Sequence, residues 1–194
     1  KSLEEIDDLL EKQEQIIEKN IIYQMNLLKR LRTNRKLISR SENLNFTLQK
    51  RPGIYRIDTQ KCYTIDLKKE EREELKEFCQ KIAFVFSTAV FPKEHIENEN
   101  KEFYYGIGVE EEFAGVLDLK ESEYVHYYPE QLCLYMTISS RSSQILTYEV
   151  LKPAFEYMEK NSLQLAGDVI SQVVSMWKPE EEYFNYHNIW IPIK

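Results

Sequence analysis

The chain has 194 residues, 42% of them hydrophobic, which is enough for one core with an appended helix. Its formal net charge of −7 excludes a chain built as a whole to sit on nucleic acid or an acidic membrane. Gly is scarce, no glycine-rich phosphate loop occurs, and no apolar run approaches the roughly 20 residues of a membrane span.

Residues 3–31 are predicted to form one helix, because apolar residues recur at helical spacing without Gly or Pro. At 1.5 Å per residue this helix would be roughly 43 Å long and would need a partner. Heptad spacing favours a coiled coil with a second copy of the chain; the alternative is a helix folded back on its own domain. The predicted dimerisation residues are Leu3, Ile6, Leu10, Ile17, Leu27 and Leu31. The chain opens at Lys1 inside this pattern, which suggests the downstream part of a longer protein.

Residues 32–53 are predicted to be a linker that ends at Pro52 and Gly53. A short basic run lies within and just before it. Contact with nucleic acid is one interpretation of that run, but it lacks interleaved aromatic residues, so a solvated connector is favoured.

Residues 54–194 are predicted to form one α+β domain, in which the order strand, helix, strand, strand occurs twice. A duplicated unit of this kind forms one curved antiparallel sheet with both helices on one face. In the second half, Ser142 or Ser143 is predicted to cap a helix that reaches about Asn161, and Pro153 is expected to kink it. The expected first-half segments are 54–65, 67–81, 82–91 and 102–109, and the second-half strands are 131–139, 168–177 and 183–193.

The last strand, residues 183–193, alternates with period two, so its side chains divide between two faces. His187 and the isoleucines at 189, 191 and 193 share the face expected to lie under the helices. The opposite face carries Tyr186, Asn188 and Trp190. Large rings with an amide favour a cavity over a solvated surface; the alternatives are a second packed layer or a patch of exposed aromatics.

Two further strands agree with this division of faces. Residues 131–139 place Leu134 and Met136 on the covered side, and Gly106 and Gly108 are expected to leave space on the open side. An open face with rings, small residues and few charges is typical of a pocket for a flat or bulky apolar ligand. The predicted ligand-binding residues are Tyr104, Cys133, Tyr135, Thr137, Tyr186, Asn188 and Trp190.

The long helix, the Arg51-Pro52 linker end, the duplicated unit and the closing run Ile189-Trp190-Ile191-Pro192-Ile193 together resemble one family. It is the GyrI-like effector-binding half of MerR-type multidrug-sensing transcription regulators, with its dimerisation helix. The resemblance covers the whole chain, although its motifs are diffuse. It implies a cytoplasmic homodimer that binds a small lipophilic or aromatic molecule. It also implies promoter binding through a winged helix-turn-helix that is absent from this chain.

One position departs from the family. Cation-binding members often carry a glutamate two positions before the aromatic residue of the last strand, and the matching residue here is Asn188. An amide cannot neutralise a lipophilic cation. Either another acid reaches the pocket, with Glu110, Glu149 or Glu182 as candidates, or the ligand is neutral.

Some relatives with this domain resemble small hydrolases, so an enzyme is the second hypothesis, and a protein-docking module that uses the same aromatic face is the third. The three histidines form no triad signature with Ser and Asp. Cys133, on the open face, could be a nucleophile if a histidine reached it, but a buried inert thiol is favoured. Cys62, Cys79 and Cys133 are widely spaced, which predicts free thiols in a reducing cytoplasm and no metal site. The sequence therefore favours a ligand-binding regulator without catalytic residues or a cofactor.

Overall fold

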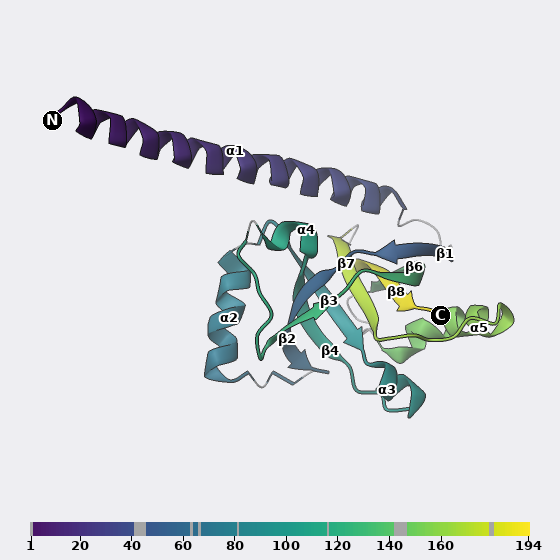
Figure 1. Ribbon diagram of the computed structural model, residues 1–194. Helices are drawn as coiled ribbons and strands as arrows, with labels where there is room; N and C mark the ends of the chain where they lie inside the picture. The colour runs from purple at the N-terminus through teal and green to yellow at the C-terminus, as the bar shows by residue number, and fades with distance from the viewer. Residues whose placement is uncertain are drawn as a thin grey trace.

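A long helix, α1 (Leu3–Arg40), extends across one side of a strand-rich domain and projects well beyond it (Figure 1). The computed structural model describes residues 2–40, 46–62, 64–65, 67–80, 82–115, 117–141, 147–178 and 181–194. The strands are β1 (Thr47–Arg51), β2 (Ile54–Lys61), β3 (Val85–Phe91), β4 (Tyr104–Glu110), β5 (Val125–Tyr128), β6 (Gln131–Arg141), β7 (Val169–Trp177) and β8 (Phe184–Pro192). The shorter helices are α2 (Lys69–Gln80), α3 (Lys93–Glu97), α4 (Glu111–Ala114) and α5 (Lys152–Lys160), with a 3-10 turn, η1 (Tyr148–Leu151), before α5.

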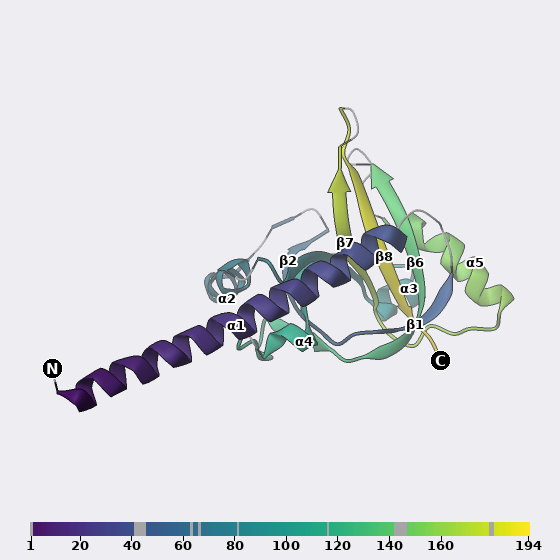
Figure 2. The ribbon, with the colours of Figure 1, turned by 90° about the horizontal axis from the view of Figure 1, so that it is seen from above.

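The eight strands form one antiparallel sheet in the order β1-β6-β8-β7-β3-β4-β2-β5. Two short links require this sheet to curl. Pro52 and Gly53 alone join β1, at one edge, to β2, next to the other edge. Pro129 and Glu130 join β5 to β6 in the same way, so both edges come together at one end of the sheet. The far ends of β7 and β8 reach away from that end (Figure 2).

The predicted duplication is confirmed. The first half runs β2-α2-β3-β4 and the second β6-α5-β7-β8, and the halves meet where β3 pairs with β7. The second helix differs from the expectation. Pro153 lies in the first turn of α5, where its missing N–H costs nothing, so it starts the helix and does not kink it. Ser142 and Ser143, the expected caps, lie outside the described residues, and Thr147 accepts a backbone hydrogen bond at the start of η1.

The helix-covered face of the sheet holds the main core. Leu134, Met136, Ile189 and Ile191 pack with residues of α5, including Ala154 and Met158. A second cluster, which includes Ile57, Val109 and Phe113, packs with Phe78 of α2. The predicted covered sides of β4, β6 and β8 are therefore confirmed, except that Leu132 is exposed.

The C-terminal half of α1 packs against its own domain, which the sequence had offered only as an alternative. Leu27 packs against the second cluster, and the ring of Tyr23 meets the ring of Phe84 edge-on, with centroids 5.6 Å apart. Leu27, which was expected in a dimer seam, is thus partly buried against its own domain. The helix also ends at Arg40 and not at Leu31, because residues 32–40 contain neither Gly nor Pro, and residues 47–51 form β1 where a linker was expected.

The N-terminal half of α1 projects away from the domain (Figures 1 and 2). Its apolar residues are exposed to solvent, among them Leu3, Ile6, Leu10 and Ile17. Among the described helices, none is long and apolar enough to cross a membrane.

Candidate functional site

The strand register places all seven predicted ligand-binding residues on the sheet face opposite α2 and α5, here called the inner face. Cross-strand partners share a face, and Tyr135 pairs with Trp190, Thr137 with Asn188 and Val90 with Tyr104. The curl of the sheet turns this face inward. Most of the seven side chains are buried, and only Tyr104 and Tyr186 are partly exposed.

The centre of the inner face is an aromatic pair. The rings of Tyr135 and Trp190 lie 4.5 Å apart between centroids, and these residues are only 5% and 6% exposed. The hydroxyl of Tyr135 donates a 2.7 Å hydrogen bond to Oδ1 of Asn188. With Oδ1 accepting this bond, Nδ2 of Asn188 is turned away from the tyrosine.

Beside the aromatic pair, four buried polar residues form a row across four neighbouring strands. The register aligns Thr88 of β3 with Gln172 of β7, then Asn188 of β8 and Thr137 of β6. Two atoms in this row are buried without a hydrogen-bond partner, Oγ1 of Thr88 and Nδ2 of Asn188. A buried polar atom without a hydrogen bond lowers the stability of the folded chain by about 1–3 kcal/mol. The stability of the free chain therefore does not explain why these residues are polar.

The space expected over Gly106 and Gly108 is filled. A Cβ on Gly106 would meet the carbonyl oxygen of Ile57 and, at 2.8 Å, Nη2 of Arg56. A Cβ on Gly108 would lie 3.1 Å from the ring of Phe86. The glycines thus admit a guanidinium and a ring from neighbouring strands, and the expectation of open space there is corrected.

Three buried arginines determine the charge of this region. Arg56 pairs with Asp58 and donates to the carbonyl oxygen of Tyr104 at 2.7 Å. Arg30 of α1 forms a 2.8 Å ion pair with Glu110, and both side chains are at least nine-tenths buried. Arg51 donates to the carbonyl oxygen of Pro129 at 2.7 Å and lies over the ring of Tyr128. Burial lowers the pKa of the Arg51 guanidinium, and this residue holds the two edges of the curled sheet together.

The acids considered as counter-charges for a cationic ligand are engaged elsewhere. Glu110 is paired with Arg30. Glu149 contacts Lys152, and Glu182 lies 3.7 Å from Arg141. On the described strands of the inner face, the two carboxylates, Asp58 and Glu110, are therefore matched by guanidiniums. Asp168, just before β7, adds a carboxylate close enough to act on Arg51 and Tyr128, and it accepts a hydrogen bond from the backbone N–H of Lys93.

The geometry around Cys133 does not suit a nucleophile. Burial raises the pKa of its thiol to about 11, so the thiol is protonated at neutral pH. His187 lies on the helix-covered face and bonds Oγ of Ser140 through Nε2 at 3.1 Å. His95 bonds the carbonyl oxygen of Glu102, and His126 is exposed on β5. Among the described residues, no group of three His, Cys, Asp or Glu side chains could hold a metal ion.

Sequence reasoning missed several residues of the inner face, namely Arg30, Arg51, Arg56, Thr88 and Gln172. A signal existed for Arg56 and Thr88, because each alternates along its strand with residues of the covered face. No local signal indicated that Arg51 and Arg56 would be buried, since charged residues are seldom buried and the covering groups come from distant strands.

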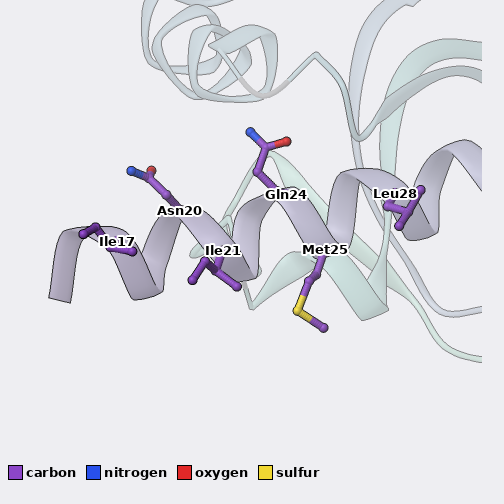
Figure 3. A pocket seen from close by; sticks show the side chains of 6 residues that line it. All are labelled: Ile17, Asn20, Ile21, Gln24, Met25 and Leu28. Carbon is purple, nitrogen blue, oxygen red and sulfur yellow. The ribbon is translucent and has the colours of Figure 1, made fainter. Parts of the chain in front are cut away.

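The exposed part of α1 carries a shallow apolar hollow of about 430 Å³ (Figure 3). Asn20 and Gln24 project to one side of this stretch, and Ile21 and Met25 project to the other. The hollow is lined by Ile17, Asn20, Ile21, Gln24, Met25 and Leu28. Of the predicted dimerisation residues, Leu3, Ile6, Leu10, Ile17 and Leu31 are exposed.

No protein-family model and no curated protein matches the sequence, but the fold is found among solved structures. The C-terminal domain of EcmrR, a MerR-family regulator, matches with a TM-score of 0.50 at 8% identity, covering 78% of this chain and 98% of that domain. EcmrR in its complex with DNA matches with a TM-score of 0.50 at 12% identity, covering 96% of this chain and 72% of that one. A hydrolase from Listeria innocua matches with a TM-score of 0.48 at 10% identity, covering 82% of this chain and 98% of that one.

Similarity at this level of identity concerns the fold. It confirms the predicted architecture, a curled antiparallel sheet of two similar halves preceded by a long helix, which is the fold that EcmrR shares.

Proposed function

We propose that this chain is the ligand-sensing and dimerising part of a transcription regulator, and that it binds a flat aromatic molecule on its inner face. The observation that carries the proposal is the row of buried polar atoms without partners beside the pair of Tyr135 and Trp190. Folding alone does not favour such atoms, whereas a ligand with complementary groups would satisfy them. The fold of EcmrR, which matches over 96% of this chain, supports the regulator class.

The proposed ligand is uncharged. The two carboxylates on the described strands of the inner face are paired with guanidiniums, and the charge of Asp168, just before β7, is opposed by the buried guanidinium of Arg51. A buried cation without a counter-charge costs several kcal/mol, and aromatic rings recover only part of that cost. Ligand entry requires a covering side chain to move, and Tyr104 and Tyr186 are the predicted contact residues that reach solvent.

The test uses acridone, a flat uncharged three-ring molecule, and the two tryptophans of the chain. Trp190 is buried on the inner face, whereas Trp177 is 58% exposed. In the Trp177→Phe variant, acridone should change the emission of Trp190 in a saturable titration. In the matched Trp190→Phe variant, the emission of Trp177 should stay constant. A saturable change from Trp177 alone, or no change from either tryptophan, would contradict the proposal.

We further propose that two chains associate through the exposed half of α1. Its apolar residues recur at heptad spacing and are exposed in a single chain, and the hollow at Ile17 to Leu28 offers a surface for a second helix. The double variant Leu10→Lys and Ile17→Lys should sediment as a monomer at concentrations where the unchanged chain is a dimer. Asp8→Lys with Gln15→Lys, on the opposite side of the helix at the same spacing, is the control and should stay dimeric. A dimeric Leu10 and Ile17 variant would contradict this interface.

The proposed regulator acts on promoter DNA through a winged helix-turn-helix outside these 194 residues. The fold shared with EcmrR, which was solved bound to DNA, supports this arrangement. An enzymatic role is not proposed, because Cys133 holds its proton and no described histidine bonds it. Simple esters should not be turned over, and stoichiometric acylation of Cys133 in mass spectrometry would contradict the ligand-binding assignment.

A further inference from the structure

The unpartnered polar atoms of the inner face differ in whether they can donate or accept a hydrogen bond. In the orientation in which Oδ1 of Asn188 accepts from the Tyr135 hydroxyl, Nδ2 is the atom that faces away, and it can only donate a hydrogen bond. Nε of Arg56, whose guanidinium lies over Gly106 in the same row, is also a buried donor without a partner. Oγ1 of Thr88, which lies between them, can donate or accept.

The unpartnered atoms are therefore mainly donors, and they belong to one stretch of the sheet. Thr88 and Asn188 are separated by two strand spacings, about 10 Å between backbones, and the inward curl favours closer side-chain ends. A three-ring aromatic molecule spans such a distance. Rings flank the row on one side at Trp190 and Tyr135, so a flat molecule that stacks there would turn its edge toward the row.

We propose that the row formed by Arg56, Thr88 and Asn188 recognises oxygen acceptors on the edge of an aromatic ligand, so that the ligand class is a flat polycyclic carbonyl compound. This inference rests on the proposed ligand-binding function of the inner face and specifies the chemistry that it selects. An aromatic hydrocarbon of the same shape would leave the donors unpaired, whereas a carbonyl oxygen would satisfy them. Selection of this kind arises because only the carbonyl oxygens form hydrogen bonds with donors that are unpaired in the free chain.

The probes are 2-(hydroxymethyl)anthraquinone and 2-(hydroxymethyl)anthracene, which are both uncharged, share their shape and differ in two carbonyl oxygens. Their affinities for the 194-residue chain are compared by isothermal titration calorimetry. The quinone should bind roughly tenfold or more tightly than the hydrocarbon, as expected for one or two hydrogen bonds to buried donors. Thr88→Val, which removes one oxygen at constant shape, and Asn188→Leu should each reduce this ratio.

Thr59→Val, the same substitution at a half-buried position of β2 outside the row, is the control and should keep the full ratio. Thr88→Val removes a buried polar atom that has no partner, so it should fold at least as well as the unchanged chain. Equal affinity of the unchanged chain for the two probes would overturn this inference and leave the binding function standing. Binding of acridone without binding of either hydroxymethyl compound would also overturn it. Failure of all three compounds to bind would contradict the binding function itself.

Discussion

The two faces of the sheet come from the same strands but differ in the side chains they hold, because the covered face is mostly an apolar core and the inner face holds a row of buried polar residues. On β8, Ile189 and Ile191 pack under α5 in a continuous apolar cluster. Asn188, directly beside Ile189, lies on the inner face with a buried donor that has no partner. Buried atoms without partners occur on the covered face too, at Nδ1 of His187 and Oδ1 of Asn185, but those of the inner face lie beside an aromatic pair. The covered face is thus explained mainly by packing, while the row on the inner face would suit a bound molecule. Functional residues here lie one position away from core residues, because side chains alternate along a strand.

The largest expected effect comes from breaking the ion pair between Arg30 and Glu110, which joins α1 to the edge of the inner face. Glu110→Gln should leave Arg30 buried without a counter-charge, which costs about 3–5 kcal/mol. The double variant Arg30→Met with Glu110→Gln should recover much of this loss, because it removes the unpaired charge. Urea unfolding followed by far-UV circular dichroism gives both values. A loss below 1 kcal/mol for Glu110→Gln would show that α1 does not pack here as described.

Substitutions at two neighbouring residues of β6 allow the stability contributions of the two faces to be compared directly. Leu134→Ala should cost about 2–5 kcal/mol, because Leu134 is fully buried in the core under α5. Cys133→Ala, on the inner face, removes a single buried sulfur atom and should cost clearly less. Both variants can be measured by thermal and urea unfolding. The opposite order would mean that the inner face, and not the covered face, is the principal core.

His187 gives the covered face a pH dependence. Burial lowers the pKa of His187 from 6.5 to about 4, so the folded state holds the neutral ring. The resulting stability is present above pH 6.5 and is lost as the pH falls toward 4, because the unfolded chain takes up the proton first. The loss should reach about 3 kcal/mol. His187→Gln should remove this part of the acid destabilisation, and His126→Gln, at an exposed position, should leave it unchanged. Identical pH profiles for the two variants would contradict the buried neutral ring.

The period-two alternation made the faces of β4, β6 and β8 predictable, because strand geometry requires neighbouring residues to point in opposite directions. The predicted ligand-binding residues consequently lie on one face. Less could be predicted where partners come from far along the chain. The Gly106 position is filled by Arg56 of another strand, and β1 is a polar segment that becomes a strand by pairing with β6. Propensity cannot indicate such long-range pairing.

The packing of α1 could likewise be predicted only in part from the sequence. Its helical period was visible, but the choice between a partner chain and its own domain depends on tertiary packing. Leu27 packs against its own domain, whereas Leu10 and Ile17 are exposed. The buried pair of Arg30 and Glu110 was also invisible, because each residue alone is typical of a surface.

The central claim is that the inner face takes a flat uncharged aromatic ligand, and Asn188 provides its most direct test. In the Trp177→Phe background, acridone and the cation 9-aminoacridine are titrated against the chain with Asn188 and with Asn188→Glu, following the emission of Trp190. With Asn188, the neutral compound should bind at least as tightly as the cation. Asn188→Glu should reverse the order and tighten the cation by about 1–3 kcal/mol, because a carboxylate then faces the ligand. If the chain with Asn188 already prefers the cation strongly and Asn188→Glu changes nothing, Asn188 does not face the ligand and the inner face is not the binding site.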